Sequence, residues 1–286
     1  MTQARSTSAS TVRLLVLGRR LRDLRRNAGK SFEDAAQILG VSALAIRRME
    51  QAQVKWKIPY IRLLLDEYGV TGEEARDFLA MTLEANQPGW WYRYRDVLPS
   101  WFKAYVSLEE EATLIRCYEP HYVPGLVQTE SYAEAVLHAG LHDTGEELGR
   151  RVALRMERQK LLTQPQAPDL WIVIDETVLR RPVVPPGVMR DQIDRLIELA
   201  DLPNVKLQVI PFELCVHEGM YGPFTFFHFE HPEMPDIVYL ENVLGAVYLD
   251  QYEDVAAFQS ALDQLCAQAL PLHRTESYLD AVRKEL

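Results

Sequence analysis

The segment from Ser31 to Ala52 most constrains what this chain can fold into. Its sequence, SFEDAAQILGVSALAIRRMEQA, places apolar residues three and four apart on either side of Gly40. Residues at this spacing fall on one helical face, so the pattern predicts two short amphipathic helices. Glycine tolerates the backbone angles of a sharp turn between them. We therefore expect a helix-turn-helix.

Both motif helices carry a chemical signal at their first residue. Ser31 precedes the first helix, and Glu33 and Asp34 follow it, where acidic charge suits the positive end of a helix. Ser42 stands at the equivalent place before the second helix. The sequence therefore predicts a serine cap on each helix.

Apolar residues at helical spacing continue on both sides of the motif. They predict a helix over residues 14–27 before it, and two helices over 59–68 and 71–84 after it. Five helices in this order resemble the Cro/repressor (Xre) helix-turn-helix family. The matching residues are the turn LGVS at 39–42, Ala36, Ile46, Met49 and Glu50. The resemblance covers about residues 12–85 and implies an all-α, lambda-repressor-like DNA-binding domain.

Charge separates the two ends of the chain. Residues 1–57 hold 12 Lys and Arg against 4 Asp and Glu, whereas the remaining residues hold 19 against 37. The first part carries a net charge of +8 and the rest −18. A basic end suits contact with phosphate, and an acidic remainder does not. This bipolar charge favours DNA binding over the alternative, an ordinary helical hairpin within a bundle.

Alignment with the family implies which side chains face DNA. It places Ala43, Leu44 and Arg48 toward base edges and Arg47 nearer the backbone. Arg48 is the expected sequence reader, because an arginine can make two hydrogen bonds to guanine, worth about 1–3 kcal/mol. A solvated helix face is the alternative for both arginines. The whole predicted DNA-binding set is Ser31, Phe32, Ser42, Ala43, Leu44, Arg47 and Arg48.

Two residues depart from the family pattern. Phe32 stands where many relatives carry Gln, which removes a polar contact to DNA, and Ala52 stands where Gly is common. Without glycine at a left-handed cap position, we expect the loop over 52–57 to be ordered differently. The other flanking bases are interpreted as phosphate contacts or solubilising charge: Arg19, Arg20, Arg22, Arg25, Arg26, Lys30, Lys55 and Lys57.

The length of 286 residues, with 48% hydrophobic content, supports two domains. We expect a disordered tail over 1–11, the helix-turn-helix domain over 12–85, an aromatic-rich junction over 86–106 and a larger domain over 107–286. The junction sequence, NQPGWWYRYRDVLPSWFKAY, favours apolar packing between the two domains. Stacking of unpaired bases on its aromatic rings is the alternative.

Composition indicates no secretion signal, membrane span, metal site or cofactor. The apolar run LLVL ends at Gly18 and Arg19, too soon for a signal peptide or a transmembrane helix. The cysteines are far apart, which argues against disulfides and zinc and suits buried residues in a reducing cytoplasm: Cys117, Cys215 and Cys266. Two histidine pairs are poorly placed to share a metal ion: His138 with His142, and His228 with His231.

The larger domain is expected to be α+β, or mixed α/β. Helices are predicted over 107–117, opened by a capping box of Ser107 and Glu110, and over 129–138 and 144–162. Strands over 170–174 and 205–212 flank a helix over 188–200, which predicts a parallel pair with a right-handed crossover. Strands over 223–229 and 236–241 suggest an antiparallel addition, and helices over 254–269 and 276–284 close the chain.

Motifs along most of the chain resemble the actinobacterial antitoxin-like Xre regulators, WhiJ-type proteins among them. They are Trp101-Phe102 with Tyr105, Leu108-Glu109, PGLVQTESYAEAVL at 124–137, RMERQKLL at 155–162, IDETVLRR at 174–181, VIPF at 209–212, YGPFTFFHF at 221–229 and VYLEN at 238–242. The resemblance implies a transcription regulator whose C-terminal domain has no assigned function. It also implies that a small protein partner is often encoded by an adjacent gene.

One polar set in the larger domain is a candidate site. Arg155, Arg158 and Gln159 lie within about one helical turn, while Glu176 and Glu241 each end a predicted strand. They form either a ligand pocket or a buried ion-pair network. The sequence has no glycine-rich phosphate loop, nucleophile elbow or metal-binding spacing, so we expect no enzyme.

Two functions from different classes are compatible with these features. The first is a cytoplasmic regulator that binds an inverted-repeat DNA operator as a homodimer, because a single helix-turn-helix makes few base contacts. Its larger domain would dimerise and sense a protein partner or a small ligand. The alternative is an interaction protein or enzyme whose N-terminal domain serves only for protein docking.

Overall fold

The computed structural model describes residues 12–86, 90–99, 101–141, 145–230 and 234–286. They form two compact units, one made of the described residues up to Glu111 and the other of most of those from Ala112 onward. The tail predicted over residues 1–11 lies outside the described residues, as do His142 and His231.

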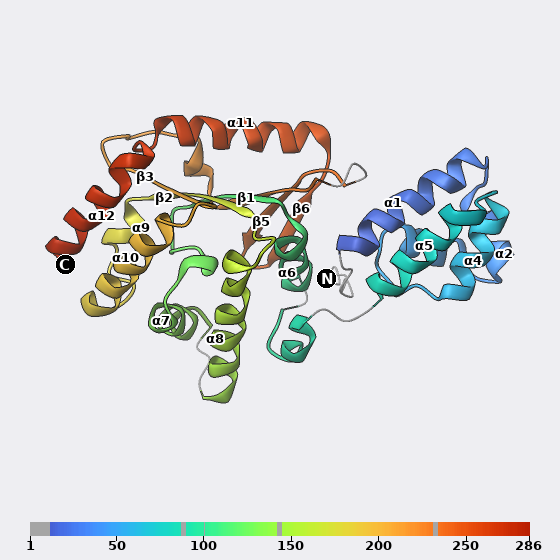
Figure 1. The fold of residues 1–286 in the computed structure, drawn as a ribbon, viewed down its shortest axis with the longest axis horizontal. Helices are drawn as coiled ribbons and strands as arrows, with labels where there is room; N and C mark the ends of the chain where they lie inside the picture. Colours follow the sequence, from blue (N-terminus) through green and yellow to red (C-terminus); the bar gives the residue numbers. More distant parts are fainter. Residues whose placement is uncertain (1–11, 87–89, 100, 142–144, 231–233) are drawn as a thin grey trace. The chain divides into compact units, whose positions relative to one another are not determined.

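The first unit contains the five predicted helices in the predicted order (Figure 1). They are α1 (Val12–Asn27), α2 (Phe32–Leu39), α3 (Ala43–Glu50), α4 (Ile58–Glu67) and α5 (Gly72–Ala85). A 3-10 helix, η1 (Trp90–Tyr94), and α6 (Phe102–Glu111) follow, and α6 packs against α1. The fold of this unit is the expected helix-turn-helix bundle.

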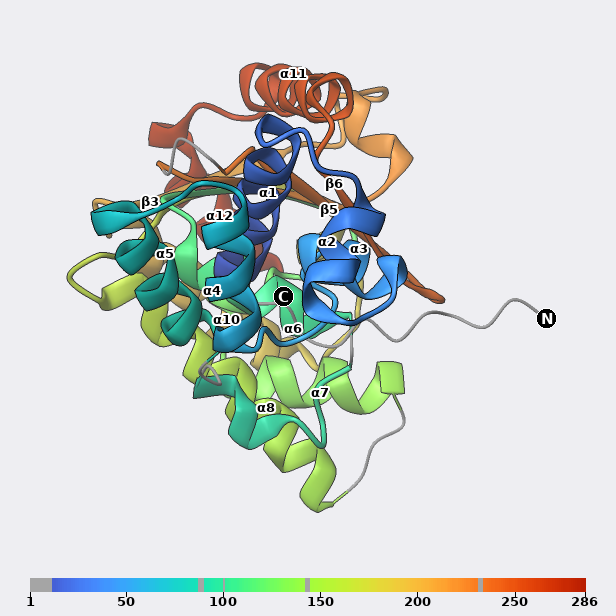
Figure 2. The ribbon, with the colours of Figure 1, turned by 90° about the vertical axis from the view of Figure 1, so that its right-hand side faces the viewer.

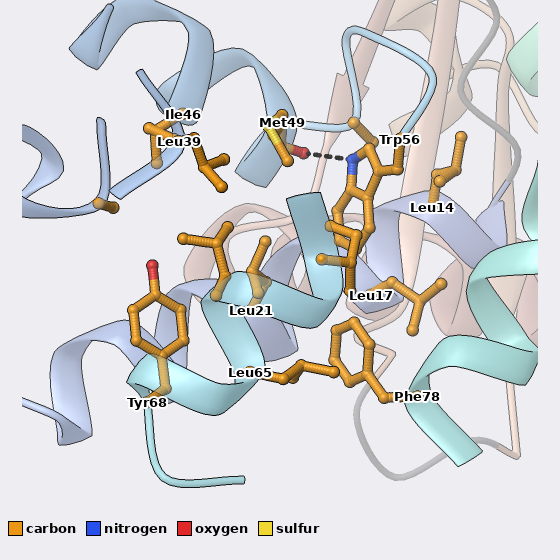
Figure 3. Packing of buried hydrophobic residues seen from close by; sticks show 14 of the residues in the cluster. Leu14, Leu17, Leu21, Leu39, Ile46, Met49, Trp56, Leu65, Tyr68 and Phe78 are labelled. Atoms are coloured by element: carbon orange, nitrogen blue, oxygen red, sulfur yellow. Dashed lines mark hydrogen bonds between the residues drawn. The ribbon is translucent and has the colours of Figure 1, made fainter. Parts of the chain in front are cut away.

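The core of the first unit lies between α1, α3 and the helices after the motif (Figure 3). Leu17 and Leu21 of α1 and Ile46 of α3 are fully buried. Trp56 reaches into the same core from the loop after α3. Its ring stacks on Phe78 with centroids 6.1 Å apart, and its Nε1 donates to the carbonyl oxygen of Met49 at 3.1 Å. This indole therefore ties the loop to the end of α3.

The described part of the aromatic segment makes local ring contacts. Phe102 and Tyr105 stack with centroids 4.8 Å apart, and the guanidinium of Arg95 lies 4.5 Å from the ring centre of Tyr92. Trp91 is buried. The role of this segment as a junction between domains stays a prediction.

The second unit is built on a six-stranded mixed sheet of order β3-β2-β1-β4-β5-β6. The first three strands are parallel and the last three are antiparallel additions. Their bounds are β1 (Leu114–Glu119), β2 (Asp169–Asp175), β3 (Val205–Ile210), β4 (Phe224–His228), β5 (Ile237–Asn242) and β6 (Gly245–Leu249). The α+β class, the parallel β2–β3 pair and the antiparallel β4–β5 pair are confirmed.

Helices cover both faces of this sheet (Figures 1 and 2). On one face, α11 (Tyr252–Gln268) packs Leu262 and Leu265 against Tyr118, Val173 and Phe226 of the strands. The other helices are α7 (Glu130–Leu141), α8 (Glu146–Gln159), α9 (Thr177–Arg180), α10 (Pro186–Ala200) and α12 (Leu272–Glu285). Three 3-10 helices complete the unit: η2 (Gly125–Val127), η3 (Lys160–Thr163) and η4 (Glu218–Tyr221). In the described residues, no helix has the length and apolar character that a membrane span needs.

The helix predicted over residues 107–117 is wrong. The chain is helical only to Glu111 and then forms β1, the strand that joins β2 to β4. Ser107 lies inside α6 and is buried, so it caps nothing. In β1, Arg116 and Tyr118 face α11. The sequence prediction missed this contact because it treated the charged segment as a helix.

Two further details correct the sequence interpretation. The short edge strand β6 was not predicted; it follows β5 through a turn in which the amide nitrogen of Leu244 donates to Asn242 Oδ1 at 2.9 Å. The cysteines are free, but only Cys117 is buried, while Cys215 is exposed. The expected role of small buried residues therefore does not extend to Cys215.

Candidate DNA-binding site

The caps that position the motif helices have the predicted form. Ser31 Oγ accepts from the amide nitrogen of Asp34 at 3.1 Å, and the carboxylate of Asp34 accepts from the amide nitrogen of Ser31 at 2.8 Å. This is a complete capping box. Ser42 Oγ accepts from the amide nitrogen of Ala45 at 3.2 Å at the start of α3. Each serine thus accepts a hydrogen bond from a backbone amide in the first turn of its helix.

The turn between α2 and α3 depends on Gly40. Its φ of 64° lies in the left-handed region, and the amide nitrogen of Val41 donates back to the carbonyl oxygen of Ala36 at 3.0 Å. This closing pattern is a Schellman motif, which favours glycine because it has no Cβ. The predicted turn is confirmed.

The helix α3 has an inward and an outward face. Ile46 and Met49 are buried in the core, whereas Leu44 is 51% exposed and both arginines of the helix are exposed. Ala43, predicted to face base edges, is half-buried and packs against the core. The side chains available on the outer face are therefore Leu44, Arg47 and Arg48.

Arg48 lines an open depression of about 260 Å³ beside α3. Leu44, Lys55, Lys57 and Tyr60 line the same depression, and Lys57 Nζ lies 5.1 Å from the ring centre of Tyr60. The loop after α3 therefore brings two lysines next to the predicted sequence reader. Tyr60 was not singled out in the sequence, because its place at the start of α4 looks like ordinary helix surface.

Phe32 lies between two arginines. The guanidinium carbon of Arg25 is 4.1 Å from its ring centre, and that of Arg47 is 5.0 Å away. Guanidinium groups at these distances are attracted by an aromatic ring. The departure from Gln at this position removes an amide but provides a ring that holds Arg47.

Arg25 is a structural residue rather than a phosphate contact. It makes two hydrogen bonds to the Glu50 carboxylate, at 2.6 and 2.9 Å, and a third to the carbonyl oxygen of Lys30 at 2.8 Å. Both side chains of the ion pair are at most 6% exposed. Hydrogen bonding to Glu50 raises the pKa of Arg25. The pair joins α1 to the last residue of α3, and the interpretation of Arg25 as a surface charge is wrong.

Two other flanking bases are held by acids on neighbouring helices. Arg20 Nη2 lies 3.2 Å from Glu74 of α5, and Lys30 Nζ lies 2.6 Å from Glu67 of α4. These pairs neutralise charge on the side chains that the sequence interpretation treated as a basic group. The bases grouped at the depression beside α3 are Arg48, Lys55 and Lys57.

The structure brings together one half of the polar set in the second unit. Arg155 Nη1 donates to Gln128 Oε1 at 2.7 Å, and Gln159 Nε2 donates to the carbonyl oxygens of Gly125 and Gln128 at 3.1 and 2.7 Å. The buried guanidinium of Arg158 lies beside Gly125, where an added Cβ would be 3.5 Å from its Nη1. Arg155, Arg158 and Gln159 thus surround η2.

The two predicted glutamates have other partners among the described residues. Glu176 accepts from Arg180, from Tyr278 and from the amide nitrogen of Phe212 at 2.8 Å. Burial acts to raise the pKa of Glu176, but these hydrogen bonds outweigh it and lower the pKa. Glu241 accepts from the Tyr239 hydroxyl at 2.6 Å. Glu176 therefore belongs to an ion pair and not to the group around η2.

Sequence reasoning missed three polar residues of the second unit. Gln128 and Gln192 are buried, and Gln192 holds the backbone of Val127 and Thr129 at 2.8 and 2.7 Å. Glu119 ends β1; burial and the neighbouring charge of Glu241 raise its pKa to about 8. The segment that forms β1 was predicted as helix and loop, so the place of Glu119 at the end of an inner strand was missed.

Comparison with known families separates the same two regions. Residues 16–78 match a family described as a helix-turn-helix domain, and residues 102–281 match a family described as a domain of unknown function, DUF5753. The chain belongs to the DUF5753 family. Neither the curated proteins nor the solved structures give a match to this DUF5753 chain.

The family matches divide the candidate residues between two regions. The capped motif, Arg48 and Phe32 lie within the helix-turn-helix match, so this DUF5753 chain carries a domain type that binds DNA. Arg155, Gln128 and Glu176 lie within the DUF5753 match. In the part of the chain that the structure describes, no cluster of three metal-ligating side chains occurs.

Proposed function

We propose that this chain is a sequence-specific transcription regulator that places α3 in the major groove of DNA. The observation that carries the proposal is the grouping of Arg48 with Leu44, Lys55 and Lys57 at one depression on the outer face of the helix-turn-helix. The arginine supplies base readout, and the lysines supply phosphate contacts. Leu44 adds only an apolar surface for a thymine methyl.

A binding-site selection with the full-length protein tests this function. Random duplex DNA is enriched at moderate salt and sequenced, and Arg48→Ala is compared with Lys57→Ala. We expect an inverted repeat whose guanine preference is lost in Arg48→Ala, at a cost of about 1–3 kcal/mol. Lys57→Ala keeps the same sequence, binds more weakly, and lowers the salt slope by about 1. Absence of an enriched sequence would sink the proposal.

We further propose that the regulator acts as a homodimer in the cytoplasm. Only Leu44, Arg47 and Arg48 of the motif helix combine exposure with a place on its outer face. So few base contacts give one copy little discrimination, and two copies on two half-sites multiply it. Sedimentation of the protein with and without operator DNA measures this directly.

The region around η2 is the proposed sensor for a small ligand or a protein partner. Its support is a buried polar network in which Arg155, Gln128 and Gln159 hold a short turn. We place the chain in the antitoxin-like Xre group, with a partner encoded by an adjacent gene, and we assign it no catalytic step. The support is the set of motifs that resemble those regulators.

Operator affinity measured with and without the protein from the adjacent gene tests the sensor. We expect Arg155→Met to remove the response while the protein stays folded and its basal operator affinity is unchanged. Loss of folding in this variant, with retention of the response in Glu241→Gln, would assign the network to the fold alone.

A further inference from the structure

The connection between β3 and β4 displays large apolar side chains to solvent. Within residues 212–221, which we name the apolar loop, Phe212 is 54% exposed, Val216 77%, Met220 65% and Tyr221 98%. Single exposed apolar residues are ordinary on protein surfaces, but a group of them marks an interaction site. Four in ten residues therefore need a physical explanation.

The backbone of the apolar loop is held in place while these side chains point outward. His217 is buried, with its Nε2 3.5 Å from Asp175 Oδ2 and its ring 5.7 Å from that of Tyr118. Gly219 lies so close to Tyr118 that an added Cβ would be 2.3 Å from the ring. At the start of the loop, the amide nitrogen of Phe212 donates to Glu176. Fixed anchors of this kind lower the entropy cost of binding a partner.

The stretch of sequence that contains the apolar loop carries charge of one sign. Residues 207–273 contain ten Asp and Glu and no Lys or Arg. Within the loop, Glu213 is exposed and Glu218 is half-buried. A surface of this charge repels DNA and anionic membranes and attracts cations. It also disfavours a second copy docked face to face, since equal acidic surfaces would meet.

We propose that the apolar loop binds a cationic segment of another protein, one that presents apolar side chains between its Lys and Arg residues. Apolar contact with Val216, Met220 and Tyr221 supplies the affinity, and Glu213 with Glu218 selects the charge. The site belongs to the second unit, and the proposal does not depend on the DNA-binding function.

A short synthetic peptide with leucine and lysine at helical spacing is the probe. Its fluorescence anisotropy is titrated with the full-length protein, with a lysine-serine peptide and a leucine-glutamate peptide as references. We expect Val216→Ser combined with Tyr221→Ser to weaken binding at least about tenfold. Leu272→Ser, an equally simple change of an apolar residue 44% exposed on α12, leaves binding within about twofold of wild type.

The charge contribution has its own matched pair of variants. The double variant Glu213→Gln with Glu218→Gln is expected to bind the leucine-lysine peptide more weakly and with a smaller dependence on salt. The control, Glu130→Gln with Glu134→Gln on α7, is expected to change neither the affinity nor the salt dependence. Equal binding by wild type and the Val216/Tyr221 variant overturns the proposal. Equal binding of the leucine-lysine and lysine-serine peptides also overturns it. A third contrary result is that the wild-type protein binds phosphatidylglycerol vesicles and the Val216/Tyr221 variant does not. Operator binding, measured in the same samples, is expected to stay unchanged.

Discussion

Phe32 lies outside the predicted recognition helix, yet its ring contacts Arg47, a residue that we propose binds DNA. One face of its ring meets Arg25, which three hydrogen bonds fix to Glu50 and Lys30. The ring is therefore anchored by Arg25, and the guanidinium carbon of Arg47 lies 5.0 Å from the centre of the same ring. An arginine restrained in this way loses less freedom when it reaches a phosphate.

Replacing Phe32 by Leu is expected to weaken operator binding by about 2- to 30-fold, the equivalent of a cation–π contact of about 0.5–2 kcal/mol. Phe32→Tyr keeps the ring and retains affinity. A double-mutant cycle with Arg47→Ala, read by anisotropy of an operator duplex, isolates the contact from any general loss of stability. An equal effect of Phe32→Leu in both backgrounds would show that the ring does not act through Arg47.

Spacing within the motif was enough to predict the inward face of α3, because a helix has a fixed period, but alignment with the family placed Ala43 outward although it is half-buried. Spacing was not enough for Arg25, whose partner Glu50 lies 25 residues further along the chain. A run of arginines looks alike in sequence whether its members meet phosphate, pair with Glu74 as Arg20 does, or close a core. Only the packing of α1 on α3 and α5 distinguishes them.

Among the elements, the end of α3 shows a local rule overridden by packing. Ala52 has a φ of 54°, and the amide nitrogens of Ala52 and Gln53 donate to Met49 and Arg48 at 2.9 and 2.8 Å. This is the same Schellman motif that glycine forms after α2, so Ala52 adopts the left-handed cap without glycine, and a different order of the loop over 52–57 stays a prediction. The left-handed conformation costs a non-glycine residue about 1–2 kcal/mol. Burial of Ala52 and the anchoring of Trp56 offset that cost.

The sheet shows the opposite case, where local signals were insufficient. The strand β2 has a continuous apolar run over 170–174, and β3 is mostly apolar, so both were predictable from composition. The strand β1 carries Arg116 and Glu119, and the acidic residues that precede it in the sequence are typical of a helix. Its identity comes from pairing with β2 and β4, which are distant in sequence. Because β1 was missed, Glu119 was missed as well.

The close contact between α1 and α3 depends on Gly18. A Cβ at this position would lie 2.4 Å from the carbonyl oxygen of Glu50, which is backbone and cannot rotate away. We expect Gly18→Ala to lower the free energy of unfolding of the first unit by about 1–3 kcal/mol. Urea denaturation followed by circular dichroism measures the change.

The matched control for that variant is Gly149→Ala on α8. An added Cβ there meets nothing within 4 Å, so the substitution should raise stability by about 0.5–1 kcal/mol through helix propensity. Opposite signs for the two alanines are the expected result. A neutral Gly18→Ala would mean that α1 and α3 can separate without loss.

At the scale of the whole molecule, charge assigns the two regions different partners. The −18 carried by residues 58–286 repels DNA, so attraction must come from the basic N-terminal part. There, Arg25, Arg20 and Lys30 are already paired with acids. The effective DNA surface is smaller than the count of basic residues suggests, which supports the proposed dimer with two copies of the motif.

A dimer of this kind should depend on the rotational phase of its half-sites. Two recognition helices related by a two-fold axis enter successive major grooves, so half-site centres lie about 10–10.5 base pairs apart, or a multiple of this spacing. Inserting about five base pairs between the half-sites of the selected operator turns one of them to the opposite face of the duplex. Affinity should then fall to that of a single half-site.

An insertion of about ten base pairs returns both half-sites to the same face of the duplex and should recover binding, provided that the dimer spans the longer distance. Electrophoretic mobility shifts on the three duplexes measure this. Equal affinity for all three would mean that each copy binds on its own, and that specificity comes from a single α3.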